Sequence, residues 1–330
     1  MLSQDFLVLG RISIEQLAPN YIHAYSFTKA ICIERTKYQF VEVYEHPVFG
    51  KMLILDGKPQ LSILDEQIYH EVLTHPAMLA HPDPRRIAIL GGGDGGILRE
   101  VLKHDSVDEV YLVDIDWRVV DICRRYLEEV SQGAFDDPRV KLVYMDAYRF
   151  IEEWNGEPFD IIIMDLTDPV SLISAGLYTY ESFETISSKL SRVGIVSVQS
   201  ESPTFSKYIF QVHFYNIAAT IGSVFNHTVL ARDYIPCFGS DWGFAYASNG
   251  EYLKRLNGES IDAELKERGV STRYFTGQVF EAITRIPKVI VEEVARSKPV
   301  YVKDAEKYIE ERAKKLRELR CLLGIEAQRF

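Results

Sequence analysis

The feature that most constrains the fold is a regular alternation of apolar and helical segments that begins near Arg85. Unbroken runs of Val, Ile and Leu are typical of parallel strands that are buried on both faces. Helical segments between such strands act as crossovers, so the pattern predicts a doubly wound α/β sheet. The five apolar segments are IAILGG (87–92), VYLVDID (110–116), VKLVYMD (140–146), FDIIIMDL (159–166) and GIVSVQS (194–200).

The end of this region predicts a change of strand direction. After a helix expected over 205–221, two further strands are expected at 227–235 and 242–249. The loop between them, PCFGSD, is too short for a crossover helix, so the last pair is predicted to be antiparallel. We therefore expect a Rossmann-like, seven-stranded, mostly parallel sheet of the type found in S-adenosylmethionine-dependent transferases.

The N-terminal region has a different texture. Short β-like stretches, with turn residues between them, predict a small antiparallel sheet, and EQIYHEVLTHPAMLAH (66–81) predicts a connecting helix. The segment 304–320 is rich in Glu–Lys and Glu–Arg pairs at helical spacing and predicts a charged helix. We divide the chain into an N-terminal β domain (1–73), a catalytic domain (74–290) and a C-terminal helical extension (291–330).

Charge and composition narrow the classes of partner. The net charge of −11 disfavours a nucleic-acid partner and suits a cationic substrate. The chain has no apolar run long enough to span a membrane, and its start lacks the features of a secretory signal, so we expect a cytoplasmic protein. The cysteines lack the spacing of a zinc site or a disulfide scaffold. They are Cys32, Cys123, Cys237 and Cys321.

The strongest local motif is GGGDGG (91–96), which joins a predicted strand directly to a predicted helix. Its glycines permit a tight turn and close approach of a nucleotide or nucleoside. The next strand ends in Asp114, placed to hold ribose hydroxyls, and the third ends in Asp146, placed to contact adenine. Asp165 and Asp168 follow the fourth. An acidic residue at one strand end is commonly a helix cap or turn residue, but four consecutive strands that end in carboxylates favour a site.

The position of Asp94 separates the candidate ligands. A turn that holds pyrophosphate disfavours a neighbouring anion, and so does one that holds the carboxylate of an ordinary methyl donor. A donor whose carboxylate has been removed presents an ammonium group instead. Asp94 therefore favours decarboxylated S-adenosylmethionine over NAD and over intact S-adenosylmethionine.

The combined blocks resemble the spermidine synthase (polyamine aminopropyltransferase) family over roughly residues 20 to 290. In detail, the DID and DLTDP blocks and the stretches VVDICRRYL and TRYFTGQVF look closest to thermospermine synthases. The blocks are TKYQ (36–39), FGKMLILDGKPQ (49–60), DEQIYHE (65–71), GGGDGG (91–96), DID (114–116), DA (146–147), DLTDP (165–169), QSESP (199–203) and YIPCFGSDWGFAYAS (234–248).

The resemblance implies a site in two parts. Around the donor or its product 5′-methylthioadenosine it implies Gln39, His70, Gly91, Gly93, Asp94, Gly96, Asp114, Asp146, Ala147 and Asp165. On the polyamine side it implies Gln60, Tyr69, Asp94, Asp168, Gln199, Glu201, Tyr234 and Trp242. It also implies a homodimer or homotetramer.

The expected reaction moves an aminopropyl group from decarboxylated S-adenosylmethionine to a polyamine amine, such as putrescine or spermidine. We expect Asp165 to act as general base and Tyr69 to orient the amine. No metal and no permanently bound cofactor are expected, because the sulfonium is already a good leaving group. Three alternatives stay open: a methyltransferase, an NAD-linked oxidoreductase and a non-catalytic polyamine-binding homologue.

Overall fold

Alternate residues of the central strands are buried on opposite faces of one large sheet. In β7 (Arg86–Gly91), Ile87 and Ile89 pack in the core on one face, and Ala88 and Leu90 pack in the core on the other. Because successive side chains point to opposite faces, burial of both faces requires unbroken apolar strands. The computed structural model describes residues 11–18, 21–167, 176–203 and 213–305.

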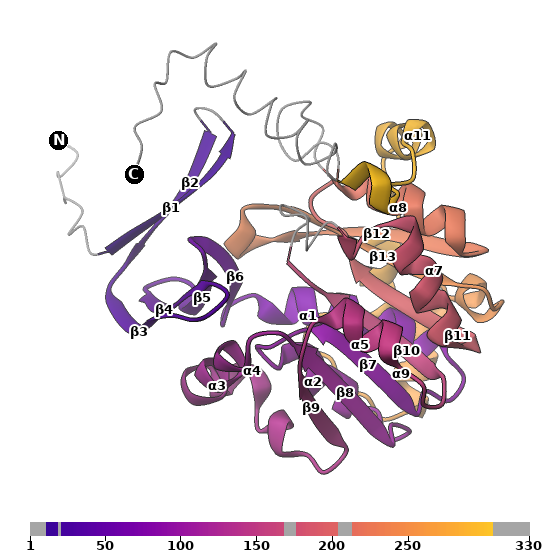
Figure 1. Ribbon diagram of the computed structural model, residues 1–330, viewed down its shortest axis with the longest axis horizontal. Helices are drawn as coiled ribbons and strands as arrows, with labels where there is room; N and C mark the ends of the chain where they lie inside the picture. Colours follow the sequence, from indigo (N-terminus) through magenta and orange to yellow (C-terminus); the bar gives the residue numbers. More distant parts are fainter. Residues whose placement is uncertain (1–10, 19–20, 168–175, 204–212, 306–330) are drawn as a thin grey trace.

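The large sheet has seven strands in the order β12-β13-β11-β10-β7-β8-β9 (Figure 1). The central strands are parallel, whereas β13 is antiparallel to both of its neighbours, as predicted. The chain order reverses between β7 and β10, which is where ligands bind in open α/β sheets. The remaining strands are β8 (Glu109–Asp114), β9 (Val140–Tyr144), β10 (Phe159–Asp165), β11 (Leu190–Gln199), β12 (His227–Ile235) and β13 (Ser240–Ser248).

Helices cover both faces of this sheet. One core involves α1, α2, α9 and α10, and the other involves α5, α7 and α8. The helices are α1 (Glu66–Ala80), α2 (Gly96–Leu102), α3 (Trp117–Tyr126), α4 (Glu128–Ser131), η1 (Ala134–Asp136), α5 (Ala147–Glu153), α7 (Tyr180–Lys189), α8 (His213–Val224), η2 (Pro236–Phe238), η3 (Tyr252–Arg255), α9 (Gly258–Glu267), α10 (Gly277–Ile283) and α11 (Lys288–Arg296). None of the described helices is long and apolar enough to cross a membrane.

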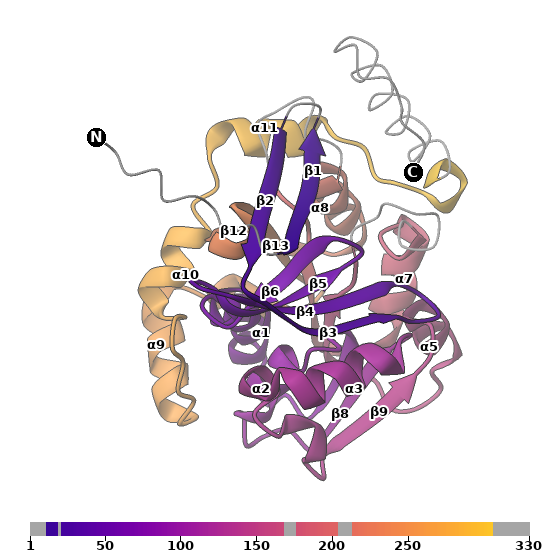
Figure 2. The same cartoon turned by 90° about the vertical axis from the view of Figure 1, so that its left-hand side faces the viewer.

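The N-terminal region forms two small antiparallel sheets beside the large one, where one was predicted (Figures 1 and 2). Val41, Val43 and Leu53 pack against Val119 and Ile122 of α3, which anchors the four-stranded sheet to the large domain. The two-stranded sheet projects beyond it as a hairpin. The strands are β1 (Arg11–Ala18), β2 (Tyr21–Phe27), β3 (Lys29–Arg35), β4 (Phe40–His46), β5 (Gly50–Leu55) and β6 (Lys58–Ser62).

Helix α1 contains a proline, and the sheet compensates for it. Pro76 has no N–H group, so the carbonyl of Val72 loses its helical partner. The Tyr246 hydroxyl donates to this carbonyl at 2.7 Å, and the Ser197 hydroxyl donates to the Leu73 carbonyl at 2.5 Å. These bonds fix α1 against β11 and β13, and so fix the side chains at its N-terminal end.

The observed helices lie as follows relative to the predicted segments, and the division into domains stays a prediction. The connecting helix lies where it was expected, but α1 runs across the proposed boundary at 73/74 and α11 runs across that at 290/291. Within the helix predicted over 205–221, the described part is α8, from His213. Residue Asp168 and the segment 306–320 of the predicted C-terminal helix lie outside the described residues.

Candidate active site

The glycine turn lies at the point where the strand order reverses, in direct contact with β10. Gly91, Gly92 and Gly95 have φ values of 83°, 71° and 84°, which favour glycine. A Cβ atom on Gly91 would lie 1.9 Å from the carbonyl oxygen of Asp165, so any side chain here would displace β10. The close approach of these two strand ends brings the turn and Asp165 together.

The same turn presses against two other predicted residues. A Cβ atom on Gly93 would lie 2.6 Å from the Asp114 carboxylate, and one on Gly96 would lie 2.2 Å from the His70 ring. Inside the turn, the backbone N–H of Gly96 donates to Asp94 Oδ1 at 2.7 Å. The turn therefore gathers residues from α1, β7, β8 and β10 at one edge of the sheet.

Asp165, the predicted base, accepts a hydrogen bond from the Tyr69 hydroxyl at 2.5 Å. Burial, together with the nearby Asp94 carboxylate, raises the pKa of Asp165 to about 7. Burial and the Asp165 carboxylate also raise the pKa of Tyr69 well above its ordinary value, so the phenol keeps its proton. A carboxyl group with a pKa near neutrality suits a general base at physiological pH.

Asp114 at the end of β8 is held close to the turn, and it accepts the backbone N–H of Asp116 at 2.8 Å. Burial raises the pKa of Asp114 to about 6. Asp116 belongs to the DID block but was not assigned to the site; it is buried and accepts hydrogen bonds from Thr36 and from Gln39. The predicted donor residue Gln39 is thus tied to the end of β8 from the N-terminal sheet.

His70 lies between two carboxylates. Its Nδ1 is 2.6 Å from Glu66 Oε2, and its Nε2 is 3.3 Å from Asp94 Oδ1. Arg99 donates to both oxygens of Glu66, at 3.0 and 2.9 Å. Neither Glu66 nor Arg99 was predicted as a site residue, although the i,i+4 spacing of Glu66 and His70 is visible in the sequence.

Asp146, predicted to contact adenine, is the N-cap of α5 and accepts the backbone N–H of Arg149 at 2.9 Å. This capping role is the ordinary explanation for an acidic residue at a strand end. Ala147, the first residue of α5, is buried beside it. Their contact with a nucleoside therefore stays a prediction.

Gln199 lies at the end of β11, on the other side of β10 from the glycine turn, and its hydrogen bonds link three segments. Its amide nitrogen donates to the Leu166 carbonyl and to Tyr178, and its oxygen accepts the indole N–H of Trp242 at 3.1 Å. Glu201 is buried in a left-handed conformation with φ of 60°, and its carbonyl accepts the N–H of Gly243. Gln199, Trp242 and Glu201 therefore meet at the start of β13.

Two predicted polyamine residues are not drawn into this group. The amide of Gln60 donates to the Lys58 carbonyl in its own strand at 3.1 Å. Trp242 is the cross-strand partner of Asp233, so the adjacent Tyr234 projects from the other face of the hairpin, where it is 53% exposed. The structure does not bring Tyr234 to Trp242, and the roles of Gln60 and Tyr234 stay predictions.

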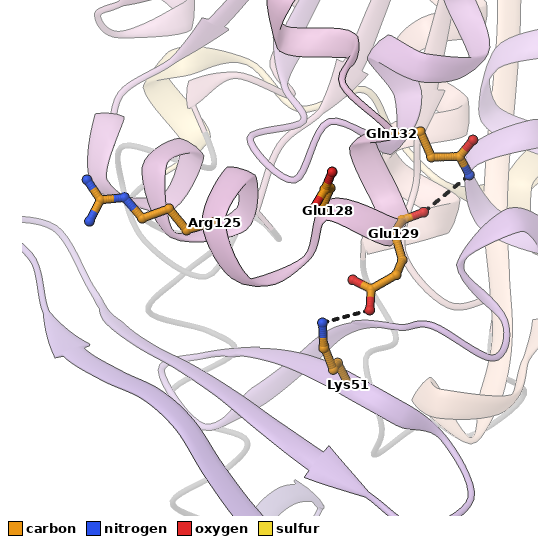
Figure 3. A pocket seen from close by; sticks show the side chains of 5 residues that line it. All are labelled: Lys51, Arg125, Glu128, Glu129 and Gln132. Carbon is orange, nitrogen blue, oxygen red and sulfur yellow. Dashed lines mark hydrogen bonds and ion pairs between the residues drawn. The ribbon is translucent and has the colours of Figure 1, made fainter.

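An open cavity of about 530 Å³ lies elsewhere, between β5 and the α3–α4 region (Figure 3). Its charged groups are largely paired: Lys51 contacts Glu129 at 2.7 Å, and Arg125 contacts Asp121 at 2.9 Å. None of its lining residues was predicted for the site. Among the described residues, no cluster of three or more His, Cys, Asp or Glu side chains is arranged to hold a metal ion.

The chain matches two known protein domains. Residues 66–256 match the spermine/spermidine synthase domain, and residues 13–62 match the spermidine synthase tetramerisation domain. Among relatives, the polyamine aminopropyltransferase of Sulfurisphaera tokodaii is 42% identical over 293 residues, which cover 88% of this chain and 95% of the relative. Polyamine aminopropyltransferase 1 of Hyperthermus butylicus is 43% identical over 274 residues, with coverage of 82% and 92%.

Solved structures agree with this assignment. A spermidine synthase in complex with the transition state analogue AdoDATO superposes with a TM-score of 0.78 at 29% identity, covering 86% of this chain and 95% of that one. The spermidine synthase of Thermotoga maritima gives a TM-score of 0.75 at 28% identity, with coverage of 86% and 94%. Fold, turn and sequence thus lead to one conclusion: the chain belongs to the spermine/spermidine synthase family and is an aminopropyltransferase.

Proposed function

We propose that this protein transfers the aminopropyl group of decarboxylated S-adenosylmethionine to a primary amine of a polyamine and releases 5′-methylthioadenosine. The observation that carries the proposal is the pair formed by Asp165 and Tyr69, 2.5 Å apart at the edge where the glycine turn meets β10. The names of the relatives and the AdoDATO complex of a similar structure support it. The acceptor is putrescine, giving spermidine, or spermidine, giving thermospermine, or both.

The donor fits the charges at this edge. Asp94, Asp114 and Asp165 influence one another electrostatically, so a ligand that adds another carboxylate is disfavoured. A donor with an ammonium and a sulfonium group is attracted instead. In this arrangement Asp114 holds the ribose hydroxyls, Asp94 faces the ammonium group, and the glycine turn permits close approach of the nucleoside.

The chemistry is a single in-line displacement. An acceptor amine is mostly protonated at neutral pH, so it first loses a proton to the Asp165 carboxylate. Its nitrogen lone pair then forms a bond to the propyl carbon next to the sulfonium, and the carbon–sulfur bond breaks. The bonding electrons stay on sulfur, which becomes the neutral thioether of 5′-methylthioadenosine. Tyr69 keeps its proton and orients the Asp165 carboxylate.

The acceptor would lie on the side of Asp165 that carries Gln199, Glu201 and Trp242. The indole ring of Trp242 packs against Phe238 with ring centroids 4.8 Å apart, and an aromatic wall of this kind covers methylene groups and attracts ammonium groups. The Glu201 side chain is buried on the same side. Asp168, predicted to contact the amine, lies outside the described residues.

The experiment is incubation of the purified protein with decarboxylated S-adenosylmethionine and a panel of amines, with products separated by chromatography. Asp165→Asn is expected to lower kcat by about 10²- to 10⁴-fold while donor binding persists. Asp160→Asn is the matched control, because Asp160 lies in the same strand and accepts the backbone N–H groups of Arg85 and Arg86 at its other end.

The same assay separates the alternatives. Methylated amines formed from intact S-adenosylmethionine would indicate a methyltransferase, and reduction of NAD would indicate an oxidoreductase. Amine binding without release of 5′-methylthioadenosine, equal in wild type and Asp165→Asn, would indicate a non-catalytic polyamine-binding protein. Any of these results contradicts the proposal.

We also propose that the protein assembles as a homodimer or homotetramer through its N-terminal sheets. The matched tetramerisation domain covers these sheets, and the β1–β2 hairpin exposes Ile12 and Ile22, at 42% and 51%. Light scattering coupled to size-exclusion chromatography measures the mass directly. A monomer at micromolar concentration would contradict this part of the proposal.

A further inference from the structure

A chain of side chains with alternating charge leads from the glycine turn into the protein interior. Asp94 contacts His70, His70 contacts Glu66, and Glu66 contacts Arg99 through two hydrogen bonds. Arg99 also donates to Glu100 at 2.7 Å and to the Val130 carbonyl at 2.6 Å. Apart from Asp94, which is slightly more exposed, these side chains are buried.

The geometry fixes the protonation of His70. Nδ1 lies at hydrogen-bond distance from Glu66 and Nε2 at ion-pair distance from Asp94, and two carboxylate neighbours favour the doubly protonated ring. Burial opposes this charge, but Asp94 and Glu66 outweigh it and raise the pKa of His70 to about 10. His70 is therefore a cation at neutral pH.

Glu66 and Arg99 hold the ring in place. Glu66 is the first residue of α1, one turn before His70, and Arg99 of α2 binds both of its oxygens. Gly96 also packs against the ring, where a Cβ atom would lie 2.2 Å from Cε1 and from Nδ1. The fixed Glu66 carboxylate holds Nδ1 of the ring, and the glycine turn packs against the ring at Gly96. The imidazolium therefore has little freedom to rotate away from Asp94.

The fixed cation acts on the proposed base. The charged groups around His70 are Glu66 from α1, Asp94 from the turn, Arg99 from α2 and Asp165 from β10, and the neutral Tyr69 ring is its neighbour on α1. Asp165 in turn is influenced by Asp94 and Asp114, which raise its pKa, and by Tyr69 and His70, which lower it. If His70 loses its positive charge, less positive charge remains to offset the carboxylates of Asp94, Asp114 and Asp165.

We propose that Glu66 and Arg99 are positioning residues for aminopropyl transfer: they hold His70 as a fixed cation against Asp94, which keeps Asp165 ionised and able to accept the proton of the amine. This inference rests on the function proposed above. It assigns a role in the reaction to two residues that lie behind His70 and that no part of the predicted site included.

The test compares two buried glutamates of α1. Glu66→Gln removes the charge that faces His70, so we expect the acidic limb of the kcat/KM profile for the donor, at saturating acceptor, to move up by about one pH unit. Activity at pH 7 should fall about 5- to 10-fold and recover by pH 9. Glu71→Gln is the control, because Glu71 is also buried in α1 but accepts the backbone N–H groups of Arg273, Tyr274 and Phe275. Its acidic limb should stay where it is in the wild type.

A second measurement does not depend on turnover. The ring nitrogens of His70, followed by NMR with labelled histidine, should show a doubly protonated ring up to about pH 9 in the wild type and in Glu71→Gln. In Glu66→Gln the ring should titrate about 3 units or more lower, below pH 7, so that it is neutral over the pH range in which the acidic limb moves. A neutral His70 at pH 7 in the wild type, or an acidic limb unmoved in Glu66→Gln, would overturn the inference. A wild-type protein that gives no aminopropylated product contradicts the proposed function instead.

Discussion

Two pairs of carboxylates in this protein have pKa values that are shifted in opposite directions. The inner pair, Glu66 and Glu100, is buried at 8% and 0% exposure, yet neighbouring cations outweigh the burial and lower both pKa values. The edge pair, Asp114 and Asp165, lies at strand ends and is only partly buried, yet burial and neighbouring carboxylates raise its pKa values to about 6 and about 7.

The difference lies in the partners that the fold supplies. Glu66 has His70 and Arg99, and Glu100 has His75, Arg99 and Lys103. In the edge pair, Asp114 accepts the backbone N–H of Asp116 and Asp165 accepts the Tyr69 hydroxyl. Among the described residues, no cationic side chain forms a hydrogen bond with either carboxylate. Carboxylates whose charge is left uncompensated in a site are typical of function, because a cationic ligand completes them. The fold therefore supplies the inner pair with its own cations, whereas the edge pair is left without one at the proposed site.

The largest expected effect tests the inner pair. Glu100→Gln leaves Arg99, His75 and Lys103 around a buried neutral amide, so we expect a loss of about 3–5 kcal/mol in the free energy of unfolding at pH 7. Because the pKa of Glu100 is lowered in the folded state, its contribution is present above the ordinary pKa of a glutamate and disappears as the pH falls below it.

Chemical denaturation at pH 7 measures this loss. Glu129→Gln is the control, because Glu129 forms a surface pair with Lys51 and should change the stability by less than about 1 kcal/mol. If both substitutions cost the same, the inner carboxylates are not the stabilising group that the comparison requires.

Ionisation of Asp165 is expected to destabilise the folded protein, in contrast to that of Glu100. The pKa of Asp165 is raised in the folded state, so folding becomes less favourable as the pH rises from about 4 through 7, and the full cost is present above that window. Asp165→Asn cannot ionise, and we expect it to be more stable than the wild type by about 2 kcal/mol at pH 8. The gain should vanish near pH 3.5 in thermal unfolding experiments. A destabilised variant at pH 8 would place Asp165 with the inner pair.

The sequence was sufficient for the edge pair and insufficient for the inner pair. Asp114 and Asp165 follow apolar strands, and the ends of parallel strands meet at one edge, so their proximity follows from the strand pattern. Glu66 and Arg99 are 33 residues apart and belong to different helices. No local pattern links them, because their contact depends on how α1 packs on α2.

Two other residues mark the limit of the sequence-based argument. Asp146 lies two residues beyond β9 and its carboxylate caps α5, whereas Asp114 is the last residue of β8 and lies against the glycine turn. The strand pattern alone does not show which acidic residue near a strand end caps the next helix. The resemblance assigns Tyr234 to the amine side, and this stays a prediction; the pairing of β12 with β13 aligns Asp233 with Trp242 and turns Tyr234 to the other face. That pairing depends on the short turn over 236–239, whose geometry cannot be deduced from the strand pattern alone.

The hydrogen bond from Tyr69 to Asp165 is expected to set part of the pH dependence. The Tyr69 hydroxyl lowers the pKa of Asp165 through its hydrogen bond, so Tyr69→Phe should raise that pKa and move the acidic limb of kcat/KM up by about one pH unit. At pH 7 the activity should fall about 10-fold, with partial recovery at pH 9. Tyr111→Phe is the control, because Tyr111 lies in β8 and its hydroxyl contacts Glu109 and Lys141 away from the site. A loss that is equal at every pH would mean that Tyr69 only fills space.

The smallest expected effect is the release of protons when the donor binds. With pKa values of about 6 and about 7, Asp114 and Asp165 are partly protonated at pH 6.5, whereas the inner glutamates are fully ionised. A cationic donor favours the ionised form of the edge pair, so binding at pH 6.5 should release a fraction of one proton, falling to zero above about pH 8.5.

Isothermal titration calorimetry in two buffers with different ionisation enthalpies measures this release. The neutral thioether 5′-methylthioadenosine, which fills the nucleoside part of the same site without a positive charge, is the matched ligand and should release fewer protons. Asp165→Asn should reduce the release for the charged donor because one of the two titrating groups is gone. Equal release for the charged donor and the neutral thioether would show that burial of the edge carboxylates, and not their attraction to a cation, sets the protonation of the site.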